Sequence, residues 1–262
     1  MLKYIVTPFG LLETYDYILF LGIIISIYIQ GWLIMTIMKK KVFLFFLAGY
    51  AMILYVGQYA AAFIRCINDG ALDGKMNLWK SVIDLSGSHF LGHVILYSLI
   101  YYPVIWVIST LFMEPDKKHI FQFFNISSIG IVVQHFFNRL GCLLRGCCYG
   151  IEYHGVFAIK FPYNKDIGHE VFPSQILEMS CMIIILIILL IRLKKKKDTF
   201  GEMIVGFGLT FFLSEFFLEN PYAVKHFNLT YIQFICIPEI IIGMIYCYKM
   251  RAQCVNGETD YE

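Results

Sequence analysis

The sequence predicts an all-α, polytopic membrane protein with seven transmembrane helices. Of its 262 residues, 59% are hydrophobic and 15% are charged, a balance that a soluble domain of this size does not carry. Apolar runs of about 17 to 25 residues, long enough to cross roughly 30 Å of hydrocarbon, recur along the chain. Clusters of lysine follow alternate runs. Together these features predict a single membrane domain over residues 1–262 in the cell membrane.

The fourth apolar run differs from the others because polar residues, among them Asn125, Gln134 and His135, interrupt it. A lipid-facing helix is not built that way, so this span is expected inside the bundle. The seven expected spans are Tyr17–Met38, Val42–Ile64, Phe90–Met113, Ile120–Phe137, Ile176–Leu193, Phe200–Leu218 and Tyr231–Tyr248.

The distribution of basic residues orients the expected spans. Twelve of the 21 Lys and Arg residues lie in four short connections on one side, namely Lys39 to Lys41, Lys117 with Lys118, Arg192 with Lys194 to Lys197, and Lys249 with Arg251. The positive-inside rule places that side in the cytoplasm, the N-terminus outside and the C-terminus inside. The net charge of +2 indicates no nucleic-acid partner, and the bilayer itself is the expected environment.

The segment from His135 to Gly150 closes the fourth span at its outward end and is the strongest candidate site. It holds Arg139 and Arg145 together with three glycines, Gly141, Gly146 and Gly150. Glycines allow backbone N–H groups to approach an anion, and guanidinium groups bind phosphate oxygens in pairs. A phospholipid headgroup is the natural anion at this depth. The alternative is that both arginines only anchor the helix at the interface.

The same segment holds three thiols, Cys142, Cys147 and Cys148, which are open to three interpretations: metal ligands, redox thiols or small packing residues. A zinc site requires a second Cys or His pair, so neither metal nor cofactor is expected. A disulfide between the adjacent Cys147 and Cys148 is strained, whereas Cys142 with either neighbour is conceivable outside the cell.

Several polar residues elsewhere are candidates for the same site. Ser174 suits a helix N-cap and Glu178 the first helical turn, whereas Gln175 has no such local role. Glu215 and Glu219 lie four residues apart and require a cation or a proton between them, for which Arg139 is a candidate. His89 and His93 share a helix face and are candidate proton carriers.

These motifs resemble the prolipoprotein diacylglyceryl transferase family, and the likeness covers nearly the whole chain. Arg139-Leu-Gly141 with Gly146 and Gly150 resembles its signature Gly-Arg-x-Gly-Asn-x-x-Asn-Gly-Glu-x-x-Gly. Thr14-Tyr15 is similar to the Tyr-Gly pair at which the family enters span one. Pro173-Ser174-Gln175 with Glu178 is similar to the family's Pro-Ser-Gln-x-x-Glu motif, and Glu215-Phe216 to its Glu-Phe in span six.

The chain departs from the family pattern at several functional positions. Cys142 and Arg145 stand where the family usually has asparagines, and Cys147 replaces its glutamate. Phe211 occupies the position of an arginine in span six, and Leu91 that of a histidine in span three. The resemblance therefore implies the fold more firmly than the activity or the substrate.

The resemblance implies transfer of a diacylglyceryl group from phosphatidylglycerol to a prolipoprotein lipobox cysteine. In that interpretation Arg139 and Arg145 hold the departing phosphate, and His93, His89 or Glu215 is the base. The expected headgroup contacts are Tyr15, Gly141, Cys142, Gly146, Cys147, Gly150, Gln175 and Glu178. Two alternatives stay open: a membrane thiol or metal module that uses the three cysteines, and a non-catalytic lipid-binding relative.

Overall fold

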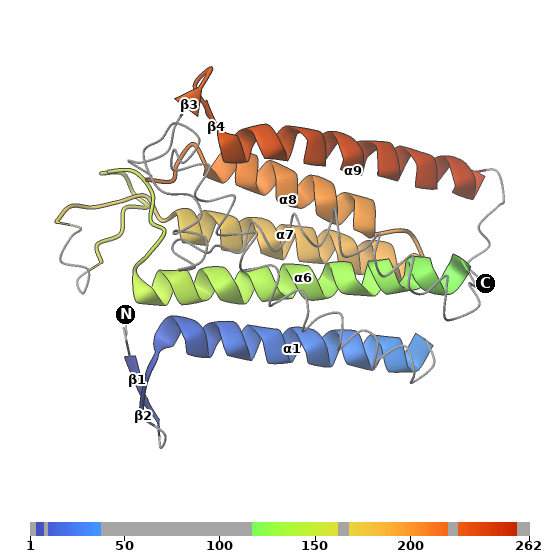
Figure 1. Cartoon of the computed structure of the whole chain (residues 1–262), viewed down its shortest axis with the longest axis horizontal. Coiled ribbons are helices and arrows are strands. Elements are labelled where there is room, and N and C mark those ends of the chain that lie inside the picture. The colour runs from blue at the N-terminus through green and yellow to red at the C-terminus, as the bar shows by residue number, and fades with distance from the viewer. Residues whose placement is uncertain (1–3, 8–9, 38–116, 162–167, 220–224, 256–262) are drawn as a thin grey trace, which may run out of the picture.

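Five long helices arranged side by side dominate the described part of the computed structural model (Figure 1). The structure describes residues 4–7, 10–37, 117–161, 168–219 and 225–255. The helices in this part of the chain are α1 (Thr14–Ile37), α6 (Lys117–Arg145), α7 (Ser174–Lys194), α8 (Phe200–Ser214) and α9 (Tyr231–Val255). Two antiparallel hairpins accompany them, formed by β1 (Tyr4–Thr7) with β2 (Gly10–Glu13) and by β3 (Lys225–His226) with β4 (Leu229–Thr230). The fold is thus mostly helical.

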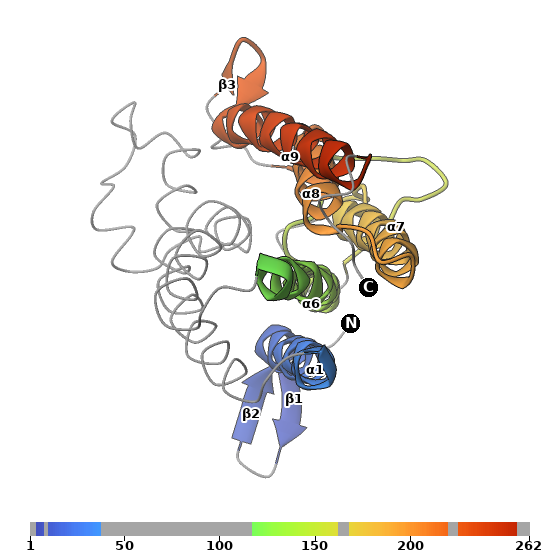
Figure 2. The ribbon, with the colours of Figure 1, turned by 90° about the vertical axis from the view of Figure 1, so that its right-hand side faces the viewer.

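The helices follow one another across the molecule in the order α1, α6, α7, α8 and α9, and each contacts the next (Figure 2). Helices α6 and α8 run opposite to α1, α7 and α9, so α6 ends where α7 begins. We call this end of the bundle the site end. Chain segments that lie far apart in sequence therefore converge there.

Five of the expected spans coincide with these helices, with shifted ends. The largest shift is in the fourth span, where α6 continues beyond Phe137 to Arg145. Conversely, α8 ends at Ser214 rather than Leu218. The other two expected spans, Val42–Ile64 and Phe90–Met113, lie outside the described residues.

The burial pattern separates an interior helix from helices with an exposed apolar face. Every residue from 124 to 135 of α6 is buried, polar side chains included, which confirms that this span lies inside the bundle. On α7, by contrast, Ile184 and Ile187 are more than half exposed. An apolar surface of that kind suits lipid rather than water.

Two helices in the described part of the chain, Ser174–Lys194 and Tyr231–Met250, are long and apolar enough to cross a membrane.

Between α1 and α6, small and polar residues permit close packing. Ser26 Oγ donates a hydrogen bond to the Gly130 carbonyl (2.8 Å), and Gln30 Nε2 donates to Ser26 Oγ (2.8 Å). Hydrogen bonds of this kind stabilise helix pairs where water is absent.

Candidate functional site

The end of α6 carries four of the expected site residues, including both arginines. Arg139, Gly141, Cys142 and Arg145 all lie within the helix, not in a loop beyond an end at Phe137. The apolar run stops at Phe137, but the helical hydrogen bonds do not depend on apolar side chains. As a result, residues at spacings of three and four, including His135, Arg139 and Cys142, share one face of α6.

Gly146 ends α6 in the left-handed conformation that glycine adopts most readily. Its φ is +76°, and the N–H groups of Gly146 and Cys147 both donate to the Cys142 carbonyl, at 2.9 and 3.1 Å. This is the usual way in which a helix ends at a glycine. A side chain at Gly146 would also approach Phe161. The glycine in the signature therefore has a backbone role, and no anion is needed to explain it.

The loop that follows α6 is fastened by its backbone to the start of α7. Ser174 Oγ donates to the Cys148 carbonyl (2.7 Å), and Gln175 Nε2 donates to the Cys147 carbonyl (2.6 Å). Ser174 is therefore not the N-cap of α7: Pro173 occupies that position, and Ser174 is the first helical residue. The expected N-cap was wrong because its hydroxyl serves the neighbouring loop instead.

Gly150, in the loop after α6, lies between two backbone segments. Its N–H donates to the Phe172 carbonyl (2.8 Å), and the N–H of Ile151 donates to the Phe217 carbonyl (2.9 Å). A Cβ at Gly150 would lie 2.5 Å from the Phe217 oxygen and 2.6 Å from the Phe172 oxygen. Only glycine fits there, so the loop, α7 and the segment after α8 are joined at this residue.

A buried ionic cluster links α6 to α7 beneath the loop. Arg139 Nε lies 2.6 Å from Glu178 Oε2, and the His135 Nε2 atom lies 3.2 Å from the same oxygen. His135 is fully buried, Glu178 is 1% exposed and Arg139 is 11% exposed. Glu178 therefore supplies the negative charge that Arg139 requires. The expectation that Arg139 pairs with Glu215 or Glu219 is replaced by this contact.

Tyr15, at the start of α1, contacts both ends of the arginine segment. Its hydroxyl donates to Asn138 Oδ1 (2.7 Å), and the Arg145 guanidinium lies 5.8 Å from the centre of its ring, within cation–π range. Gly141 permits this approach, since a Cβ there would lie 3.1 Å from Tyr15 Cδ2. Tyr15, Gly141 and Arg145 are thus brought together as expected from the signature.

The three thiols of the signature also meet at the site end. The sulfur atoms of Cys142, Cys147 and Cys148 lie within 4.8 Å of one another, and none of the three cysteines is in a disulfide bond. The pKa of the Cys147 thiol is raised to about 12: its hydrogen bond with Cys142 lowers the pKa, but its hydrogen bond with Cys148 and its burial together raise it further. At neutral pH this thiol is protonated and is a weak nucleophile.

The structure gives fewer contacts for the remaining candidate site residues. Glu215 follows the end of α8 and interacts electrostatically with Cys236 of α9. His89 and His93 lie outside the described residues. Asn138 and His135 were not assigned roles in the expected site, although both lie close to Arg139 in α6. The four-residue spacing from Arg139 was the signal that could have identified His135, whereas Asn138 is recognised only from its hydrogen bond with Tyr15.

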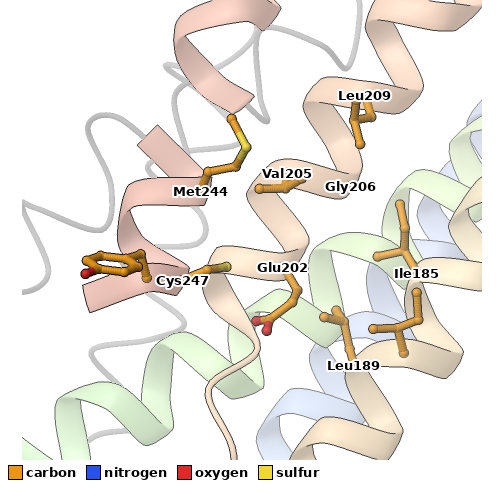
Figure 3. Close-up of a pocket in the computed structure, with 10 residues that line it drawn as sticks. Ile185, Leu189, Glu202, Val205, Gly206, Leu209, Met244 and Cys247 are labelled. Carbon is orange, nitrogen blue, oxygen red and sulfur yellow. The ribbon is translucent and has the colours of Figure 1, made fainter. Parts of the chain in front are cut away.

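A groove elsewhere in the bundle is separate from this cluster. It has a volume of about 460 Å³ and lies between α7, α8 and α9, with Glu202 at one end and Leu209 at the other (Figure 3). Glu202 forms an ion pair with Arg192, near the end of α7 opposite the site end. The lining is mostly aliphatic, and its one carboxylate, Glu202, is already paired with Arg192.

Comparison with known proteins gives a family match over most of the chain. The family model for prolipoprotein diacylglyceryl transferase matches residues 8–249. That range includes every candidate site residue described above. It confirms the resemblance that the signature and the Pro-Ser-Gln motif indicate.

Two curated relatives are similar at lower coverage. A phosphatidylglycerol–prolipoprotein diacylglyceryl transferase 2 of Clostridium perfringens (strain 13 / Type A) is 28% identical over 151 residues, covering 55% of this chain and 58% of the relative. A phosphatidylglycerol–prolipoprotein diacylglyceryl transferase of Wolbachia pipientis subsp. Culex pipiens (strain wPip) is 28% identical over 137 residues, or 48% and 51% of the two chains. The matched regions thus span little more than half of these relatives.

Proposed function

Because the chain belongs to the prolipoprotein diacylglyceryl transferase family, we propose that it transfers a diacylglyceryl group from phosphatidylglycerol to a cysteine thiol of a prolipoprotein. The family and the membrane-length helices make it a membrane protein. We further propose the seven-span arrangement with the site end outside the cell, where a lipid headgroup and a secreted substrate both have access.

The observation that carries the proposal is the pair of arginines at the site end. Arg139 is held by Glu178, and Arg145 lies over Tyr15 one and a half turns further along α6. Arginine has five N–H donors, so a single carboxylate oxygen does not exhaust those of Arg139. Both cations are therefore suited to binding phosphate oxygens of a headgroup next to the loop.

The proposed reaction needs a base for the acceptor thiol and a cationic site for the departing phosphate. A base removes the proton of the acceptor thiol, and the thiolate sulfur then attacks the glycerol carbon that carries the phosphate ester. The carbon–oxygen bond breaks, and its electron pair leaves with glycerol phosphate. Arg139 and Arg145 stabilise the negative charge that develops on the leaving phosphate. Glu215, His89 and His93 are the proposed bases.

Glu178 and Gln175 act as positioning residues in this proposal. Glu178 fixes the guanidinium of Arg139, and Gln175 fixes the carbonyl of Cys147 at the loop. Fixed donors need no reorganisation when charge develops, which is the main source of electrostatic catalysis. Tyr15, Cys142 and Cys147 border the same space and are proposed to line the headgroup site.

The direct test is incubation of the purified full chain with phosphatidylglycerol and a lipobox peptide, followed by mass spectrometry. We expect a diacylglyceryl mass gain on the peptide cysteine, and Arg139→Ala to lower the rate by about 100-fold or more. Lys194→Ala, at the opposite end of α7, is the matched control and should leave the rate unchanged.

The Clostridium perfringens relative serves as the positive control for the assay. If it modifies the peptide and this chain does not, the proposed activity is wrong. Binding of phosphatidylglycerol without transfer would then favour the non-catalytic lipid-binding alternative.

A further inference from the structure

The thiols of Cys142, Cys147 and Cys148 form a cluster whose sulfur chemistry the proposed transfer reaction does not use, although two of these residues are proposed to line the headgroup site. Their sulfur atoms lie within 4.8 Å of one another at the end of α6. A metal–thiolate bond is about 2.3 Å long, so three sulfurs around one ion lie roughly 4 Å apart. The cluster is already close to that arrangement, and small rotations of the side chains would complete it.

We propose that these three cysteines bind one copper(I) ion through three thiolates. Thiolates are soft ligands that favour copper(I), zinc and iron–sulfur clusters. Structural zinc takes four ligands, and among the described residues the gathered His, Cys, Asp and Glu groups at this position are the three cysteines alone. Copper(I), in contrast, can be bound by three thiolate ligands alone. The expectation of no metal rested on the missing second ligand pair, which zinc needs and copper(I) does not.

The surrounding charges suit the anionic complex that results. Binding releases three protons to solvent, and one copper(I) with three thiolates carries a net charge of −2. Arg139 interacts electrostatically with Cys142 and Cys148, and Arg145 with Cys147. Two cations therefore lie close to the excess negative charge.

The backbone holds the three residues in place without help from their side chains. Cys142 lies in the last turn of α6, and Gly146 turns the chain back so that Cys147 and Cys148 follow it directly. Gln175 and Ser174 then hold the carbonyls of Cys147 and Cys148. Such preorganisation lowers the entropic cost of gathering three ligands.

The test is a copper(I) titration of the full chain in detergent under argon, reduced with a phosphine and competed with bathocuproine disulfonate. We expect one copper(I) per chain, and Cys147→Ser or Cys148→Ser to weaken binding by about 100-fold or more. Cys181→Ser in α7 is the control and should bind as the wild type does. Equal affinity in the cluster variants would overturn the proposal.

A measurement on the wild type covers the case in which serine variants do not fold. The reduced protein is treated with a maleimide with and without copper(I), and the labelled peptides are identified by mass. We expect copper(I) to protect Cys147 and Cys148, the two partly exposed thiols of the cluster, together. Unchanged labelling of these two would refute the site, and tighter binding of zinc than of copper(I) would refute the choice of ion. Neither readout depends on transferase activity.

Discussion

Glu178 of α7 forms an ion pair with Arg139 of α6, with 2.6 Å between Oε2 and Nε, although the two residues lie 39 positions apart in the chain. The carboxylate is 1% exposed, so the pair is almost fully removed from water. It connects the helix that carries the signature to the helix that begins with the Pro-Ser-Gln motif. Stability and phosphate binding are therefore expected to depend on the same contact.

Glu178→Gln is predicted to destabilise the protein strongly because it leaves the Arg139 charge buried without its partner. Loss of one member of a buried pair costs about 3–5 kcal/mol in the free energy of unfolding. The double variant Arg139→Met with Glu178→Gln should be less destabilised than the sum of the two single variants. Thermal unfolding of the three variants in detergent measures their stabilities. If the loss of stability in the double variant equals the sum of the two single losses, the ion pair contributes nothing.

Gly130→Ala is predicted to loosen the contact between α1 and α6. A Cβ at this position would overlap the side chain of Gln30, which is 1% exposed and hydrogen-bonded to Ser26. Overpacking of this kind costs about 1–3 kcal/mol in stability. Gly168→Ala is the matched control, since nothing lies within 4 Å of its Cβ. Adding Gln30→Ala to Gly130→Ala should recover part of the loss; no recovery would locate the strain elsewhere.

The Asp198 carboxyl, between α7 and α8, is predicted to make stability depend on pH. Burial, the largest cause, raises its pKa from 3.8 to about 6, while the N–H of Gly201 lowers it in part. Between these two values the folded state binds the proton more tightly than the unfolded state, so stability falls as pH rises through this window. Above pH 6 the carboxyl is ionised in both states, and the full loss of stability caused by its burial is present.

Asp198→Asn should remove this penalty, because the amide oxygen still accepts the Gly201 hydrogen bond without carrying charge. The variant should unfold at a higher temperature than the wild type at pH 7, and the difference should shrink towards pH 4. A difference in melting temperature that does not change with pH would contradict the assignment.

The proposed topology predicts which residues an impermeant maleimide reaches in intact cells. In a chain without other cysteines, Val156→Cys should be labelled from outside, because Val156 is 96% exposed in the loop after α6. Lys197→Cys, exposed between α7 and α8, should be labelled only after the membrane is opened. Labelling of Lys197→Cys in sealed cells would reverse the orientation.

Cys147 is predicted not to form a covalent intermediate. Its thiol is protonated at neutral pH, and attack on the glycerol carbon would leave a thioether, which is a very poor leaving group for a second transfer. Intact-protein mass after exposure to phosphatidylglycerol should therefore show no adduct. An adduct that Cys147→Ser abolishes, and that moves on to the acceptor peptide, would disprove this.

Much of the helical fold could be predicted from the sequence because apolar length is a local property. The start of α9 at Tyr231 and the start of α8 at Phe200 coincide with the expected spans. The end of α6 could not be found in this way, since an apolar run stops at Phe137 whereas the helix continues through Asn138 and Arg139. Hydrogen bonding of the backbone, which hydropathy does not report, decides that end.

Within the candidate site, the sequence could group residues along one segment but could not indicate their contacts. Gly146 and Gly150 were expected to admit an anion, yet one ends a helix and the other lies between two backbone segments. Arg139 was expected near Glu215 and Glu219, and only the packing of α6 against α7 selects Glu178. Spacing along one segment cannot reveal which distant helix lies beside it.

The loop after α6 is attached through the carbonyls of Cys147 and Cys148, to which Ser174 and Gln175 donate hydrogen bonds. A carbonyl is present whatever side chain the residue carries, so this attachment does not depend on the cysteines themselves. Evolution can thus exchange the side chains at these two positions while the path of the loop persists. A change of side chain at Cys147 is therefore expected to alter the chemistry at the end of α6 without moving the backbone that presents it.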